Sequence, residues 1–137
     1  MNTKPPITLS RLDLERLEKL LDALPPGRFP QEDLLRDELQ RATVLEPADM
    51  PGNVVTMNSR VRFAVQPAGK EYEMTLVYPR DADGSTDRIS VFAPVGAALL
   101  GLSVGDHMAW PVPAGGSIDV RIVDVVYQPE RAGELHR

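Results

Sequence analysis

Two groups of carboxylates are the residues best suited to bind a cation. Glu32 and Asp33 are adjacent at the start of a helical pattern, and Asp81, Asp83 and Asp87 lie together in a turn. Carboxylate oxygens are good ligands for divalent ions, but the turn lacks the spacing and terminal glutamate of a calcium-binding loop. Acids at a helix start are also stabilised by the helix dipole. We therefore expect helix-start residues and a solvated turn, and predict no metal site.

The remaining side chains show no pattern typical of nucleophilic or acid–base catalysis. The chain has no cysteine, and its two histidines, His107 and His136, form no pair. The serines Ser59, Ser90 and Ser103 lack the nucleophile-elbow context of serine hydrolases. The sequence thus predicts no catalytic residue and no cofactor.

The stretch ISVFAPVGAALLGLSVGD (89–106) carries the most distinctive pattern. A β-type run breaks at Pro94 and passes into a short Ala/Leu helix that ends at glycine, and proline is favoured at the first helical position. Phe92, Ala93 and Val95 leave this corner without charge. We expect it to present apolar surface to a protein partner.

The N-terminal part of the chain has the pattern of two helices. Ser10 and Asp13 have capping-box-like spacing, which predicts a helix that begins near residue 11. Its apolar stripe consists of Leu14, Leu17, Leu21 and Leu24. Proline and glycine then break the pattern, and a second helix is predicted over residues 31–44, with Leu35, Leu39 and Ala42 on one face. The two helices predict an antiparallel αα-hairpin, a short coiled coil.

Residues 46–51 read as a linker, after which the hydrophobic period changes to that of strands. Strand patterns occur around residues 61–65, 72–78, 89–92, 108–112 and 118–127. About five strands and one short helix predict an α+β fold with a mostly antiparallel sheet. We predict an N-terminal domain over residues 1–48 and a C-terminal domain over residues 49–137.

Composition excludes some classes of function. The 137 residues carry a formal charge of −5 and no basic block interleaved with aromatics, so direct nucleic-acid binding is not expected. The N-terminus has no apolar signal segment, and no apolar run is long enough to span a membrane. We expect a cytoplasmic protein without membrane contact.

Several ordered motifs resemble the C-terminal domain of the Gre transcript-cleavage factors. They are MNSRVRF (57–63), TLVYPRDAD (75–83), the stretch 89–106, WPVPAGG (110–116) and VVYQPERAG (125–133). The forms VVTMNS (54–59), APVGAALLGL (93–102) and YQPE (127–130) are more similar still to a GreA/GreB subfamily of nucleoside diphosphate kinase regulators. The resemblance covers nearly the whole chain.

The resemblance implies an FKBP-like C-terminal fold and RNA polymerase as the partner, approached at the rim of its secondary channel. A Ser-Pro segment of the Gre factors belongs to their polymerase-contacting surface, and Ala93 and Pro94 stand at the matching positions here. Phe92 stands where Gre factors often have a polar or acidic residue. We predict an anchor centred on Phe92 and Pro94, with Val95 and Leu99 close by.

The N-terminal hairpin departs from the Gre pattern. Gre factors have a long coiled coil whose acidic tip supports metal-assisted RNA cleavage, whereas about 14 residues per helix give an arm of only about 20 Å. Its tip has Arg28 in a loop without acids, followed by Glu32 and Asp33. We therefore predict binding without catalysis, in competition with Gre-type factors, and an indirect effect on nucleoside diphosphate kinase.

Three alternatives stay open at this point. Glu32 and Asp33 could support a Gre-like cleavage activity, or the FKBP-like fold could carry peptidyl-prolyl isomerase activity, although fold alone does not imply function. The third alternative is direct contact with nucleoside diphosphate kinase.

Overall fold

The computed structural model describes residues 7–24, 32–66, 70–82, 87–111 and 116–134. The helices in these ranges are α1 (Arg11–Asp22), α2 (Glu32–Arg41) and α3 (Pro94–Leu99), with two 3-10 turns, η1 (Pro47–Asp49) and η2 (Pro79–Asp81). The strands are β1 (Thr8–Ser10), β2 (Thr43–Leu45), β3 (Arg60–Gln66), β4 (Lys70–Val77), β5 (Arg88–Ser90), β6 (His107–Pro111) and β7 (Ser117–Tyr127). None of the helices in these ranges is long and apolar enough to cross a membrane.

The start of α1 is fixed by its cap, as the sequence predicts. Ser10 has extended backbone angles, and its Oγ accepts a hydrogen bond from the N–H of Asp13 at 3.0 Å. Such a cap satisfies one of the free donors of the first turn and is worth about 1 kcal/mol. The buried side of α1 includes Leu17 and Leu21, two members of the predicted stripe.

The second helix is shorter than predicted. α2 ends at Arg41, and Thr43 to Leu45 form strand β2 instead of a last helical turn. β2 pairs in parallel with β1, with Thr8 opposite Thr43. The β-branched residues Thr43 and Val44 suit a strand better than a helix end, but it is the distant partner β1 that makes the strand possible.

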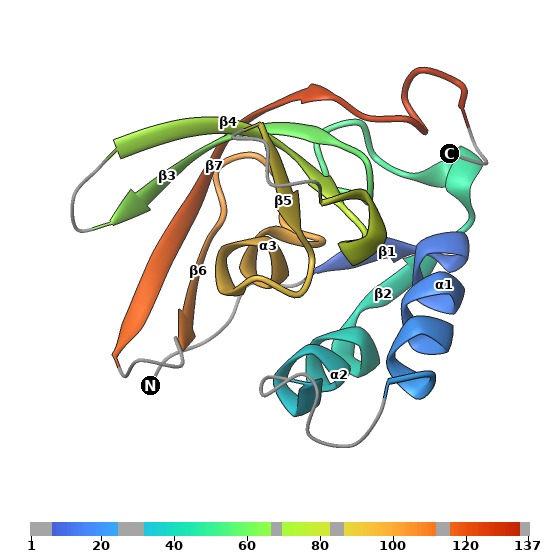
Figure 1. The fold of residues 1–137 in the computed structure, drawn as a ribbon. Helices are drawn as coiled ribbons and strands as arrows, with labels where there is room; N and C mark the ends of the chain where they lie inside the picture. The colour runs from blue at the N-terminus through green and yellow to red at the C-terminus, as the bar shows by residue number, and fades with distance from the viewer. Residues whose placement is uncertain (1–6, 25–31, 67–69, 83–86, 112–115, 135–137) are drawn as a thin grey trace.

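The five predicted strands form one sheet in the order β5-β4-β3-β7-β6. All pairs are antiparallel except β4–β5, and β3 is paired on both sides, with Phe63 opposite Tyr72 on β4 and Ile122 on β7. The sheet curls around α3, which lies on its concave side (Figure 1). The α+β prediction, with one short helix in the sheet domain, is confirmed.

The N-terminal elements share a hydrophobic core with the sheet. One buried cluster includes Leu17, Leu21 and Leu35 from the helices together with Phe63 and Trp110 from the sheet. Backbone contacts join the same parts, since the N–H of Thr8 donates to the carbonyl oxygen of Gly101 at 3.1 Å. The helices therefore pack directly beside the sheet (Figure 1). The domain boundary at residue 48, the coiled coil and the FKBP-like type stay predictions.

Candidate functional site

The corner between β5 and α3 is held by two hydrogen bonds to one residue. The carbonyl oxygen of Ser90 accepts from the N–H of Ala93 at 3.0 Å, and the Ser90 Oγ accepts from the N–H of Phe92 at 3.0 Å. Ala93 is the N-cap without a side-chain bond, and Pro94 starts the helix, where its missing N–H removes no helical bond. The corner thus has a defined backbone shape.

Gly96 allows α3 to lie against the end of β5. A Cβ atom at this position would be 2.0 Å from the carbonyl oxygen of Ser90 and 3.2 Å from the Cα of Val91. Real Cβ atoms do not approach backbone that closely, so only glycine fits. The close packing fixes the position of Phe92 and Pro94 relative to the sheet.

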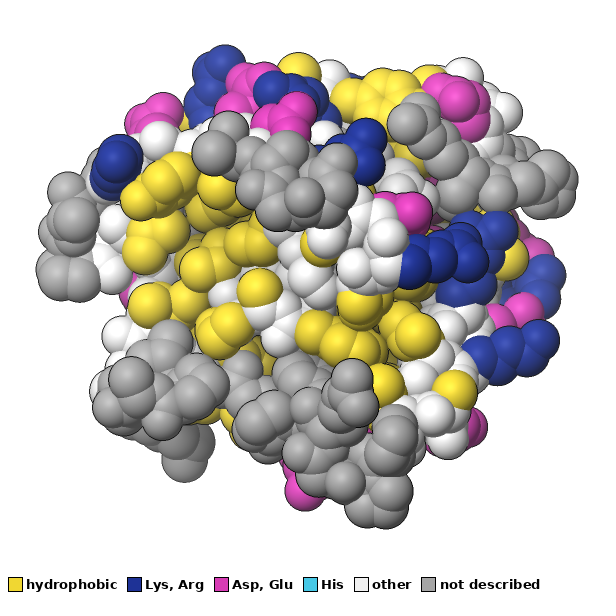
Figure 2. All heavy atoms as spheres, viewed as in Figure 1, with side chains coloured by type: hydrophobic (Ala, Val, Ile, Leu, Met, Phe, Trp, Pro, Cys, Tyr) yellow, Lys and Arg dark blue, Asp and Glu magenta, His cyan; other side chains and the backbone are white. Residues whose placement is uncertain are grey.

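Four of the five predicted contact residues lie at the surface of this corner. Phe92, Ala93, Pro94 and Val95 are partly exposed. Leu99 is 1% exposed and belongs to the core, so it supports α3 from below and offers no contact surface. Hydrophobic side chains gather over α3 and the neighbouring strands on the face in Figure 2. The arrangement can bury an apolar partner without performing chemistry.

The predicted tip residues are not assembled into a metal site. Arg28 lies outside the described residues. Glu32 accepts from the Arg36 side chain at 2.7 Å, which is an (i, i+4) ion pair of the helix, and Asp33 is exposed. Among the described residues no cluster of three or more acids and histidines is placed to hold a metal.

The other polar residues considered from the sequence have structural surroundings. Ser59 is fully buried and its Oγ accepts from the N–H of Thr56 at 2.9 Å. The imidazole of His107 lies 3.7 Å from Asp119 on an exposed part of the sheet, while His136 and Asp83 lie outside the described residues. Phe63 is 1% exposed, and its ring stacks on that of Tyr72 with the centroids 5.6 Å apart.

Asp13 is a residue whose main role sequence reasoning missed. The pattern identifies it only as a helix-start acid, but it is 2% exposed and its Oδ2 accepts from the N–H of Met57 at 3.1 Å. This bond joins α1 to the segment before β3. Burial raises the pKa of Asp13 from 3.8 to about 7, and the negative charge of Glu130 adds to the rise, against the opposing effects of the Met57 bond and Arg16.

The raised pKa predicts how stability depends on pH. Between about pH 4 and pH 7 the native state holds a proton on Asp13 that the unfolded chain has lost, so the free energy of unfolding falls as pH rises through this window. The contribution is about 4 kcal/mol at most. Asp13→Asn, which keeps an oxygen acceptor, should remove this fall and be more stable than the natural chain at pH 8.

Urea unfolding of both proteins at pH 5, 6, 7 and 8 measures the effect. The difference between the two plots of unfolding free energy against pH reports on Asp13 alone, because both proteins contain all the other titrating groups. Parallel pH profiles for the natural chain and Asp13→Asn would rule out a proton on the native Asp13.

The YQPE motif has a structural role in the same region. Gln128 is fully buried, and its Nε2 donates to the carbonyl oxygens of Pro51 at 2.7 Å and Val54 at 2.8 Å. Glu130 accepts from the Thr56 hydroxyl at 2.8 Å. The motif therefore joins the segment before β3 to the end of β7.

Two family models together match most of the chain. The model "Transcription elongation factor, GreA/GreB, C-term" matches residues 50–127, and the model "Rnk N-terminus" matches residues 5–45. The chain is 44% identical over 132 residues to the "Regulator of nucleoside diphosphate kinase" of Escherichia coli K12, covering 96% of this chain and 97% of that protein. It is 33% identical over 99 residues to the GreA of Oenococcus oeni, covering 72% of this chain and 59% of that protein.

A solved structure shares the fold. The "Prokaryotic transcription elongation factor GreA/GreB from Nitrosomonas europaea" superposes with a TM-score of 0.71 at 54% sequence identity, covering 90% of this chain and 100% of that chain. The similarity includes both the N-terminal helices and the sheet, because the aligned region covers nearly the full length of both chains.

Proposed function

Since this chain belongs to the GreA/GreB family, and to its Rnk branch, we propose that it is a non-catalytic regulator that binds RNA polymerase. It docks at the rim of the secondary channel and competes there with Gre-type cleavage factors. The protein acts in the cytoplasm, where it meets the polymerase. Its relative is named a regulator of nucleoside diphosphate kinase, and we expect an effect of this chain on that enzyme to be indirect, through transcription.

The short helical arm is the observation that carries the proposal. α1 has 12 residues and α2 has 10, which gives lengths of about 18 and 15 Å at 1.5 Å per residue. Catalysis requires groups within coordination or hydrogen-bonding distance of the reacting atoms. Helices of this length, packed beside the sheet, are too short to carry a metal ion to a distant active centre. The protein can therefore occupy a binding site on the polymerase without taking part in RNA cleavage.

The corner formed by Phe92, Ala93, Pro94 and Val95 is the proposed docking surface. Its partly exposed apolar groups stand on a backbone fixed by Ser90 and Gly96. A rigid surface loses little conformational entropy on binding, which favours affinity. Leu99 contributes by holding α3 in place from the core.

A transcript-cleavage assay tests the non-catalytic part. With stalled polymerase complexes and Mg²⁺, this protein should not shorten the transcript beyond the polymerase's own activity. Glu32 is already engaged with Arg36, so Glu32→Gln and Asp33→Asn should leave this result unchanged. Mg²⁺-dependent shortening by the natural chain that these two variants lose would establish the cleavage alternative instead.

A further inference from the structure

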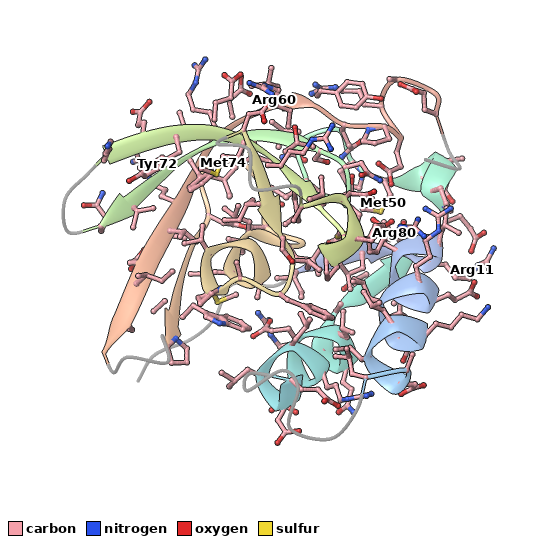
Figure 3. The ribbon with its side chains drawn as sticks, viewed as in Figure 1. Arg11, Met50, Arg60, Tyr72, Met74 and Arg80 are labelled. Atoms are coloured by element: carbon pink, nitrogen blue, oxygen red, sulfur yellow. The ribbon has the colours of Figure 1, made fainter. Side chains whose placement is uncertain are left out.

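An open pocket of about 580 Å³ lies between α1 and the turn at η2, and its lining includes none of the residues of the corner at α3. Its charged lining consists of Arg16 and Lys19 from α1 and Arg80 and Asp81 from η2. Figure 2 shows Lys and Arg side chains gathered at the right of the view, and Figure 3 places Arg80 beside α1. The volume is in the range of small-molecule sites.

The charge of this pocket is opposite to that of the chain. Three of the lining residues are cationic and one is acidic, in a protein with a formal charge of −5. The single acid, Asp81, lies 3.7 Å from the Arg80 guanidinium. A local excess of positive charge in a concave site attracts anions, and guanidinium groups suit phosphate oxygens in particular.

The pocket wall also contains a buried hydroxyl. Tyr78 is 7% exposed, and its hydroxyl lies within hydrogen-bonding reach of the Arg16 side chain. Burial raises the pKa of Tyr78, the charge of Asp13 adds to the rise and Arg16 opposes it, so the phenol keeps its proton. The phenol and the Arg16 guanidinium thus place two polar groups together at the pocket wall.

The pocket lining also includes a polar residue and an apolar side. Asn58 has a left-handed φ of 67°, and its N–H donates to the carbonyl oxygen of Leu76 at 2.6 Å, which fixes its place in the wall. Leu20, Ala23 and Pro79 add an apolar side. Small-molecule sites combine such apolar surface with a few placed polar groups.

We propose that this pocket binds a nucleotide, with its phosphates on the cations of α1 and η2 and its ring on the apolar side. The pocket shares no residue with the proposed docking surface. A negative result for nucleotide binding would therefore not count against the docking proposal.

The test is a titration of the full ¹⁵N-labelled chain with ADP, sodium pyrophosphate and adenosine at low salt. ADP should shift the amides of Ala23, Asn58 and Arg80 most, pyrophosphate should bind more weakly, and adenosine more weakly still. Arg80→Ala and Arg16→Ala should each weaken ADP binding by about fivefold, as expected for one charged contact at a solvent-accessible site.

Arg121→Ala is the matched control, because Arg121 is an exposed cation of β7 outside the pocket. It should leave the ADP affinity unchanged. The proposal is overturned if ADP shifts no pocket amide, if Arg121→Ala weakens binding as much as Arg80→Ala, or if ADP and pyrophosphate bind equally well. Arg80 is largely exposed, with a side chain that is 85% accessible, so its replacement should not unfold the protein.

Discussion

Phe92→Asp is expected to weaken binding to RNA polymerase by at least about tenfold, since a central aromatic contact is worth about 2 kcal/mol or more. The substitution removes an apolar ring from the proposed docking surface and places a charge where the partner would exclude water. Phe92 is only partly buried, so the native fold should persist. Quantitative pull-down or fluorescence anisotropy with purified polymerase measures the loss.

The matched control is Val126→Asp. Val126 is a 41% exposed apolar residue of β7, so this variant adds the same charge outside the proposed surface and should bind normally. Pro94→Asp should act like Phe92→Asp, because both side chains belong to one surface. Unchanged polymerase binding by folded Phe92→Asp and Pro94→Asp would show that the partner docks elsewhere.

Gly96→Ala should lower the free energy of unfolding by about 3 kcal/mol, at the upper end of overpacking effects. The added Cβ would be 2.0 Å from a backbone oxygen, and neither Ser90 nor the helix backbone can move aside as a flexible side chain would. α3 must therefore shift away from β5, which also displaces the docking corner. Urea unfolding measures the stability, and the same polymerase assay measures the second effect.

Gly105→Ala provides the comparison for this variant. Gly105 has a φ of +91°, but nothing lies within 4 Å of an added Cβ, so only backbone strain of about 1–2 kcal/mol is expected. Gly105→Ala should also leave polymerase binding unchanged. If Gly96→Ala were no less stable than Gly105→Ala, the close contact between α3 and β5 would not exist in solution.

Local patterns in the sequence were sufficient to predict much of the fold. The cap at Ser10 marks the start of α1, and alternating residues such as Val61 and Phe63 mark β3, because capping and strand periodicity depend only on near neighbours. The end of α2 was predicted wrongly for the opposite reason. Thr43–Leu45 becomes a strand only through pairing with β1, which lies some 35 residues earlier, and no local pattern reports such a pairing.

In the candidate site, too, the sequence predicted the features that depend on near neighbours and missed those that depend on distant ones. Pro94 and the following Ala/Leu run predict the corner, but the burial of Leu99 depends on which side of a six-residue helix faces the sheet. The bond from Met57 to Asp13 spans 44 positions, so the sequence predicted the cap at Ser10 but not the buried link that Asp13 also makes. The pocket likewise combines Arg16 with Arg80, which only the folded chain brings together.

Displacement of a Gre factor from RNA polymerase tests the central claim most directly. A fluorescently labelled Gre cleavage factor is bound to the polymerase, and increasing amounts of this protein, or of its Phe92→Asp variant, are added. The natural chain should release the labelled factor in a saturable manner and the variant should release it only at much higher concentration. Binding of both proteins to one polymerase, with the labelled factor fully retained at saturation, would contradict the proposed function.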